Sequence, residues 1–346
     1  MIEAGAADTG PGRGGLVLPM LGALLLLLTV LSLGTGPVAV PPDRVVDLLL
    51  HGGEFPEDEA AAVIIRQLRP PRVLLAILVG ASLGLCGAVM QGFFQNPMAD
   101  PYIIGVSSGA ALGATIALAF SIDMWLFGVH SASLFAFAGA LAVTILVYAV
   151  ARRGGKVPTT LLLLTGVAVG SLAAAATSLV MITGKTDLHR ILFWLLGSFS
   201  SRRWEHVNMV WPWALVGVVT LQFFARDLNI LLQGEENAQF LGVDVERVKR
   251  LLLVITALLT AAAVSVSGII GFVGLIVPHV MRLLVGPDHR RLLPASLLGG
   301  AILLVAADML ARTLIAPAEV PVGVITALLG CPFFLYLLSR RRDVVV

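Results

Sequence analysis

The sequence predicts an all-α fold, namely a polytopic integral membrane protein with about ten transmembrane helices. Hydrophobic residues make up 58% of the chain and charged residues only 13%, whereas a soluble domain carries about 25% charged residues. The mean hydropathy is +0.96, and apolar runs recur close to the roughly 20 residues that cross a bilayer. We therefore interpret residues 1–346 as a single transmembrane domain and not as a series of globular domains.

Ten apolar runs follow one another along the chain, and most are long enough to cross a membrane. They lie at 16–35, 73–94, 102–120, 131–150, 158–183, 206–225, 251–270, 272–286, 292–314 and 319–339. The first is interpreted as a retained helix behind a short tail, 1–15, because only one basic residue precedes it and no cleavage site follows. The eighth is short and contains Pro278, which predicts a half-length or kinked helix.

The basic residues predict the orientation of these spans. With an internal N-terminus, 14 of the 23 Lys and Arg residues fall on the inner side and 9 on the outer side. The positive-inside rule favours this topology, so both termini are expected in the cytoplasm and the chain in the bacterial cytoplasmic (inner) membrane, in contact with lipid. A net charge of only +2 gives no reason to expect a nucleic acid as partner.

The outer connections are predicted to be a solvated cap at 36–72 and a short amphipathic helix within 184–204. The longest inner connection, 226–250, reads as two short helices joined at Gln233 and Gly234. Phe240 and Leu241 give it apolar side chains that a solvated connector does not need, which favours docking into a groove of another protein.

A hinge separates the second and third apolar runs. Pro97 and Pro101 lie four residues apart, so the helix must break between Gln95 and Gly109. The amide of Asn96 and the carboxylate of Asp100 make this break polar, and it is predicted to contact solute or a partner.

The sequence offers no catalytic chemistry. Gly184-Lys185-Thr186 resembles the end of a phosphate-binding loop, but residue 179 is Leu where that loop needs glycine. The six histidines form no recognised ligand pair, and no acidic cluster could hold a metal, so no catalytic or metal residue is predicted. Asp308 and Arg312 form an i, i+4 pair that anchors a helix end. An ion-coupled carrier usually needs more buried carboxylates than these spans contain. The energy for transport is therefore expected from a partner protein, with an ion-coupled carrier as the alternative.

A faint internal repeat is also present. Arg69-Pro70-Pro71-Arg72, an apolar run and Gln91-Gly92 resemble Arg247-Val248-Lys249-Arg250, an apolar run and Ile270-Gly271. On the topology above, the first unit starts outside and the second inside, which is typical of an inverted repeat in a transporter.

Five stretches in order make the chain similar to a known family from about 16 to 339. They are Leu68-Arg69-Pro70-Pro71-Arg72, Asn96-Pro97-Met98-Ala99-Asp100-Pro101 with Gly105-Val106-Ser107, Gly234-Glu235 through Leu241-Gly242-Val243, Gly271-Phe272-Val273-Gly274-Leu275-Ile276-Val277-Pro278-His279 with Asp288-His289-Arg290, and Ala318-Glu319-Val320-Pro321-Val322-Gly323-Val324. The chain resembles the FecCD family, the permease subunits of ABC importers for iron-siderophores, haem and cobalamin.

The resemblance implies an ATP-driven alternating-access importer of a metal chelate. Two copies of the chain would form the pore as a homodimer, two ATPase subunits would bind the cytoplasmic face, and a periplasmic or lipoprotein binding protein would deliver the chelate. ATP and Mg would be bound by the ATPase, so the chain itself would hold no cofactor and would not be an enzyme. A secondary transporter acting alone and a non-transporting membrane scaffold are the alternatives.

The resemblance also implies roles for particular residues. Those expected to dock the ATPase are Gln233, Gly234, Glu235, Glu236, Ala238, Phe240, Leu241, Gly242 and Val243. Those expected to meet the binding protein are Arg69, Arg72 and Arg312, with snorkelling at the interface as the alternative. Those expected at the inner gate and pore are Asn96, Pro97, Met98, Thr159, Thr160, Gly166 and Val169, with helix capping as the alternative for the threonines.

Overall fold

A computed structural model describes residues 13–36, 40–41, 44–45, 63–126, 128–184 and 188–340. Most of the predicted tail 1–15 and of the cap 36–72 lies outside these residues, as does Lys185. The transmembrane elements are α1 (Arg13–Gly34), α4 (Arg69–Phe93), α5 (Val106–Ala119), α6 (Ser131–Ala151), α7 (Thr159–Thr183), α9 (Trp204–Phe223), α12 (Val245–Ser267), α13 (Val273–Val285), α14 (His289–Thr313) and α15 (Val322–Arg340).

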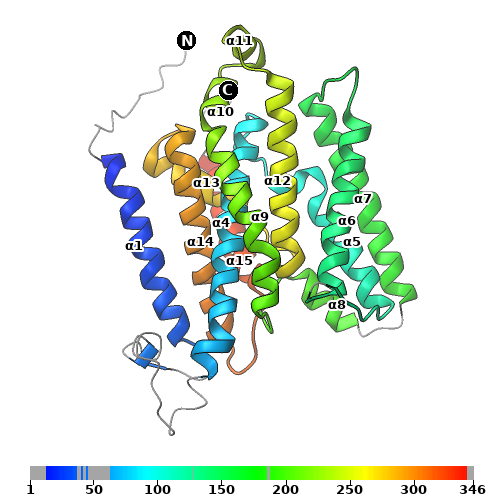
Figure 1. Ribbon diagram of the computed structural model, residues 1–346, viewed down its shortest axis with the longest axis vertical. Coiled ribbons are helices and arrows are strands. Elements are labelled where there is room, and N and C mark those ends of the chain that lie inside the picture. The colour runs from blue at the N-terminus through cyan, green and yellow to red at the C-terminus, as the bar shows by residue number, and fades with distance from the viewer. Residues whose placement is uncertain are drawn as a thin grey trace.

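The ten helices run back and forth between two ends of the molecule (Figure 1). One end carries the short helices α10 (Ala225–Leu231) and α11 (Glu235–Phe240), and we call it the α11 end. The opposite end carries α8 (Leu188–Leu195), and we call it the α8 end. Helix α1 starts and α15 finishes at the α11 end, as an even number of crossings requires.

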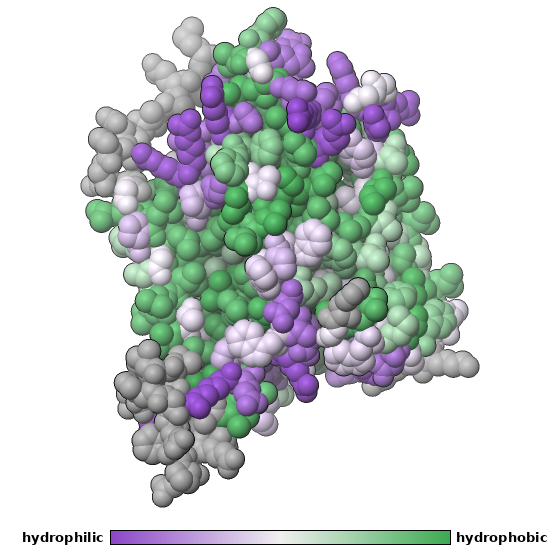
Figure 2. Space-filling view, viewed as in Figure 1, coloured by the Kyte–Doolittle hydropathy of each residue, from purple (hydrophilic) through white to green (hydrophobic). Residues whose placement is uncertain are grey.

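The length and composition of the described helices confirm the prediction of about ten spans. Six helices are long and apolar enough to cross a membrane, and α9 with α10, bent by 52°, gives a seventh. The shorter apolar helices α5, α13 and α15 complete the set. The predicted short eighth span is α13, which has 13 residues and contains Pro278. On the face that Figure 2 shows, apolar side chains dominate the middle, and polar side chains gather at the α11 end and, in smaller number, toward the α8 end.

The core centres on α4, which packs against α14, α12, α13 and α9. Helices α4 and α14 pack closely where Gly80 faces Gly300. A Cβ on either glycine would collide with the backbone of the other helix, so the contact depends on both being small. Helix α12 runs in the opposite direction to α4, as the predicted inverted repeat requires (Figure 1).

Several boundaries differ from those expected. Helix α12 begins at Val245, so the predicted inner connection 226–250 gives way to the helix before its end. Helix α4 begins at Arg69, directly after the short π-helix η2 (Ile64–Leu68), so Arg69 and Arg72 both belong to its first turn. A two-stranded hairpin, β1 (Trp125–Leu126) with β2 (Val129–His130), closes the connection between α5 and α6.

Candidate functional site

A buried ion-pair network lies at the α8 end, where α1, α4 and α14 meet. The Arg72 guanidinium donates to both oxygens of Asp308, at 2.8–3.2 Å, and to Oε1 of Glu319 at 2.7 Å. Asp308 is fully buried and also pairs with Arg312, whose Nε lies 3.1 Å from its Oδ2. Two arginines thus neutralise one buried carboxylate, a geometry that a planar guanidinium fork favours.

The same arginines fasten α1 to the bundle. Arg312 donates to the carbonyl of Thr35 at 2.9 Å and to Oγ of Ser32 at 2.6 Å. Arg69 donates to the carbonyl of Leu33 at 2.6 Å. These bonds provide donors for backbone carbonyls at and just beyond the C-terminal end of α1, which lack partners within the helix.

The three arginines expected to meet a binding protein are therefore buried and paired within the chain. The exposed fractions of Arg69, Arg72 and Arg312 are 6%, 9% and 2%. Snorkelling would leave their charged heads in water, which is not what the structure shows. Docking to a second protein stays a prediction. A binding protein would meet arginines whose guanidinium groups already bond to groups of this chain.

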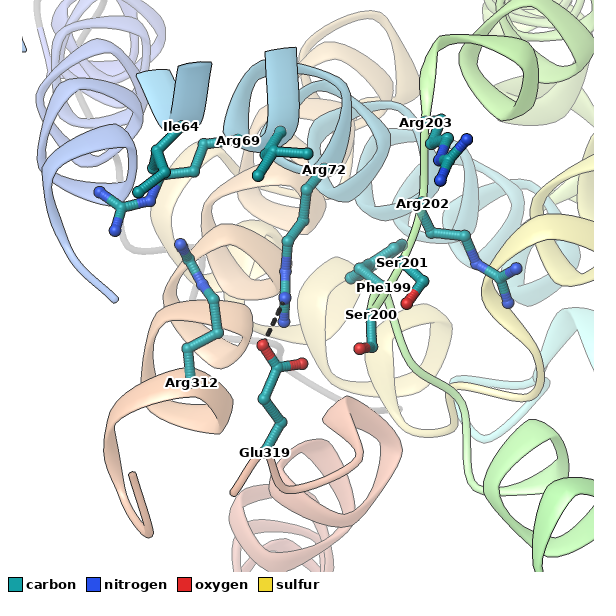
Figure 3. Close-up of a pocket in the computed structure, with 11 residues that line it drawn as sticks. Ile64, Arg69, Arg72, Phe199, Ser200, Ser201, Arg202, Arg203, Arg312 and Glu319 are labelled. Carbon is teal, nitrogen blue, oxygen red and sulfur yellow. Dashed lines mark hydrogen bonds and ion pairs between the residues drawn. The ribbon is translucent and has the colours of Figure 1, made fainter. Parts of the chain in front are cut away.

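A cavity of about 440 Å³ opens beside this network. Figure 3 shows Arg72 reaching from α4 to Glu319, with Arg312 beside it, and Arg202 and Arg203 beyond Ser200 and Ser201. Burial lowers the pKa of Arg202 to about 10. Burial alone would raise the pKa of Glu319, but the hydrogen bond from Arg72 holds it below its usual range. Five of the eleven residues that line the cavity are arginines, against one carboxylate, Glu319.

Arg202 and Arg203 were not among the expected site residues. They come from the turn between α8 and α9, far along the sequence from Arg72. Their only signal in the sequence is a pair of adjacent arginines ahead of Trp204 on the outer side. That pattern is equally typical of a membrane-interface anchor, so spacing alone does not single it out.

The hinge lies at the α11 end and is held by its own side chains. Asn96 accepts from the N–H of Met98 at 2.9 Å, and Asp100 accepts from the N–H of Tyr102 at 2.8 Å, capping η3 (Pro101–Ile104). The side chain of Gln95 donates to the carbonyl of Leu231 in α10 at 2.6 Å. The break predicted from the prolines is confirmed, and it is tied directly to the inner connection.

The other expected gate and pore residues have different surroundings. Thr159 and Thr160 open α7 at the α11 end, where Thr160 is exposed. Val169, further along α7, is partly exposed. Gly166 is buried with a Cβ position that would collide with the carbonyl of Ile103, so it serves the packing of α7 on η3. Its expected place in the pore lining stays a prediction.

The inner connection forms the two short helices that the sequence predicts, α10 and α11, joined through Gln233 and Gly234. Gly234 has a φ of +102°, a conformation that favours glycine. At the tip, Phe240 is 89% exposed and Leu241 61% exposed, whereas Ala238 is fully buried. The remaining docking candidates Glu236 and Gly242 are exposed, and Val243 is partly exposed. Two large apolar side chains thus project from the α11 end.

Glu235 differs from the other docking candidates because its carboxylate has a partner within the chain. Its Oε1 lies 2.9 Å from Nζ of Lys249, near the start of α12. Lys249 in turn donates to the carbonyl of Val157 at 3.2 Å, just ahead of α7. Local spacing reveals neither contact, because Lys249 lies 14 residues from Glu235 and 92 residues from Val157.

A second set of polar contacts connects α10 to the start of α14. The side chain of Asn229 donates to Asp288 at 2.6 Å and accepts from the N–H of His289 at 2.9 Å. Beside it, a cavity of about 500 Å³ is lined by hinge residues together with Arg282 and His289. Among the described residues, no group of three or more His, Cys, Asp or Glu could hold a metal ion.

Known proteins resemble this chain over nearly its whole length. Residues 24–340 match the FecCD transport family. The chain is 52% identical over 289 residues to the cobalamin import system permease protein BtuC of Halobacterium salinarum, covering 84% of this chain and 77% of that protein. It is 42% identical over 332 residues to the hemin transport system permease protein HmuU of Yersinia pestis, covering 94% and 96%.

A solved structure agrees with these relatives. It belongs to a transporter assigned to the metal-chelate type of ABC transporters, in an inward-facing conformation. The two chains superpose with a TM-score of 0.83 at 34% identity, covering 94% of this chain and 99% of the other. The fold, the family match and the relatives lead to the same conclusion: this chain belongs to the FecCD transport family.

Proposed function

We propose that the chain is the membrane-spanning subunit of an ABC importer that carries a metal chelate of the iron-siderophore, haem or cobalamin class by ATP-driven alternating access. The observation that carries this proposal is the pair α10–α11, which presents Phe240, 89% exposed, at the same end as the hinge and Thr160. An exposed aromatic on a short helix suits a groove in a partner protein.

The chemistry of the relatives supports the class of substrate. One relative is described as a permease for cobalamin and another as a permease for hemin. Both ligands hold a metal ion inside a large organic chelator. We propose a bulky chelate as the cargo of this chain as well, moved without chemical change.

The proposed assembly contains two copies of the chain, two ATPase subunits that bind ATP and Mg, and a periplasmic or lipoprotein binding protein. Helix α7 supports the second copy because it exposes large apolar side chains: Val167, Leu172 and Leu179 are each more than 60% exposed. Either lipid or a second copy can cover such a surface, and the pore of the assembly would lie between the copies.

We further propose that the α11 end faces the cytoplasm. The connections and helix ends at this end carry most of the described basic residues, including Arg152 and Arg153 after α6 and Arg290 and Arg291 in the first turn of α14. The positive-inside rule then directs this end inward. The ATPase would meet α10 and α11 there, and the binding protein would meet the cavity beside Arg72 at the α8 end.

An ion-coupled carrier acting alone has less support. Within the described transmembrane helices, Asp308 is the carboxylate that lies beyond a first turn, and both of its oxygens are paired with arginines. A proton or sodium relay needs carboxylates that can change their charge during transport.

The proposal is tested by reconstituting the chain with its ATPase and binding protein in proteoliposomes and measuring ATP-dependent uptake of a panel of chelates. The panel contains a ferric siderophore, haem and cobalamin, with the metal-free chelators as controls. We expect saturable uptake of one class and none of the metal-free forms. Uptake of none of the three chelates by a complex that hydrolyses ATP would contradict the proposed substrate class.

A further inference from the structure

Lys249 is a buried cation that contacts three separate segments of the chain. Its side chain is 4% exposed, and its ammonium lies 2.9 Å from Oε1 of Glu235 in α11. The same ammonium donates to the carbonyl of Val157, in the connection between α6 and α7, at 3.2 Å. It also lies 5.8 Å from the ring centroid of Phe93, at the end of α4.

Burial makes these contacts mutually dependent. An ammonium removed from water is costly unless it is paired and hydrogen-bonded. One nitrogen therefore has its charge paired by α11 and a second of its donors bound by the segment ahead of α7. If α11 moves, the ammonium either follows Glu235 and changes its bond to Val157, or stays and loses its only carboxylate among the described contacts.

Val157 is held on both sides of its backbone. Its N–H donates to Glu246 at 3.3 Å, and its carbonyl accepts from Lys249, so two side chains of α12 clamp one residue. Val157 is 3% exposed. Pro158 caps α7 immediately afterwards, and Thr159 begins the helix. The clamp therefore sets where the first turn of α7 lies relative to α12.

From this geometry we infer that Lys249 is a positioning residue, which transmits a displacement of α11 to the start of α7, where the inner gate is expected at Thr159 and Thr160. The inference rests on the proposed function, because the displacement of α11 is attributed to an ATPase that binds it. The ATPase would then act on the gate through Glu235, Lys249 and Val157, in addition to any rocking of whole helices.

A purely stabilising ion pair can be distinguished from this role by chemistry. Exchanging the two charges, Glu235→Lys with Lys249→Glu, restores an ion pair between α11 and α12. A carboxylate at position 249 has no proton to donate to the carbonyl of Val157. The exchanged pair therefore keeps the helix contact and loses the gate contact.

The experiment uses the complete complex of chain, ATPase and binding protein in lipid. Lys249→Met removes the charge at similar length, and Arg250→Met on the exposed side of α12 is the matched control. Two quantities are measured, namely chelate transported per ATP hydrolysed and the ATP-dependent change in distance between spin labels at Thr160→Cys. Both are compared with the wild-type chain.

We expect Lys249→Met to retain ATP hydrolysis, to transport at least about fivefold less chelate per ATP, and to lose the distance change at position 160. The exchanged pair should be equally uncoupled, and Arg250→Met should match the wild type. If Lys249→Met does not assemble, Glu246→Leu, which frees only the N–H of Val157, should show the same uncoupling in smaller degree.

Two results would overturn the inference. One is a Lys249→Met complex whose transport per ATP is within about twofold of the wild type and whose distance change persists. The other is an exchanged pair that transports normally, which would assign Lys249 to stability alone. A wild-type complex without ATP-dependent uptake would instead contradict the proposed function, and that outcome is visible before any variant is compared.

Discussion

At the scale of single residues, the network around Asp308 is the most demanding feature of the molecule. Asp308 is fully buried between Arg72 and Arg312, and Glu319 completes the arrangement at 2.7 Å from Arg72. The sequence shows one of these pairs, Asp308 with Arg312, because they are four residues apart. Arg72 lies 236 residues from Asp308, and no local spacing reveals such a partner.

Removing the central carboxylate should be costly. Asp308→Asn leaves two buried guanidinium groups without their counter-charge, and we expect a loss of about 3–5 kcal/mol in the free energy of unfolding. The measurement is denaturant unfolding of the purified chain in detergent. Asp123→Asn removes an exposed carboxylate at the same end and should change stability by only about 0.5 kcal/mol. Equal losses in the two variants would contradict a structural role for the network.

Glu319 gives the network a dependence on pH. Its pKa is lowered from the ordinary value of 4.5 despite burial, chiefly by the hydrogen bond from Arg72. A carboxylate with a lowered pKa contributes stability that is fully present above its ordinary value and is lost as the pH falls through the lowered value. The thermal stability of the wild type should therefore fall in acid below pH 4.5. Glu319→Gln should show a shallower fall, and identical pH profiles for the two chains would refute the assignment.

At the scale of helices, two kinds of contact organise the molecule. Small residues bring the central helices together, as at Gly80 and Gly300, and buried polar groups tie the short helices at the α11 end to the spans. Hydropathy predicts which segments cross the membrane, including the half-length α13 with Pro278. It carries no information on which helix packs against which, because that depends on shape and on distant polar partners.

The contact between α4 and α14 can be tested by adding volume. Gly80→Val should prevent the close approach to Gly300 and reduce both the yield of folded chain and its melting temperature. Gly22→Val in α1 is the control, because no atom lies within 4 Å of the Cβ position there. Similar melting temperatures for the two variants would show that the helices tolerate a wider separation.

The projecting tip of α11 can be tested by removing its aromatic ring. Phe240→Ala should weaken co-purification of the ATPase by about tenfold or more, as expected when an aromatic anchor is lost from an interface. Phe120→Ala removes an aromatic side chain, 58% exposed, at the opposite end and should leave co-purification unchanged. A Phe240→Ala chain that retains its ATPase as well as the control would place docking elsewhere.

At the scale of the whole molecule, the two ends are connected by continuous helices. Helix α14 begins beside Asn229 and α10 at one end and finishes with Arg312 at the other. The resemblance to the FecCD family supplied the candidate docking and gate residues, and the family is confirmed over residues 24–340. The polar contacts of Lys249 and Asn229 could not be predicted, because each links residues that only the folded chain brings together.

The most direct test of the central claim is the energy source of uptake. Proteoliposomes containing the chain, its ATPase and its binding protein would be supplied either with ATP alone or with a proton or sodium gradient alone. Initial rates of chelate uptake would then be compared under the two conditions. We predict uptake with ATP and none with either gradient. Uptake driven by a gradient without ATP would show that the chain is an ion-coupled carrier and would contradict the proposed function.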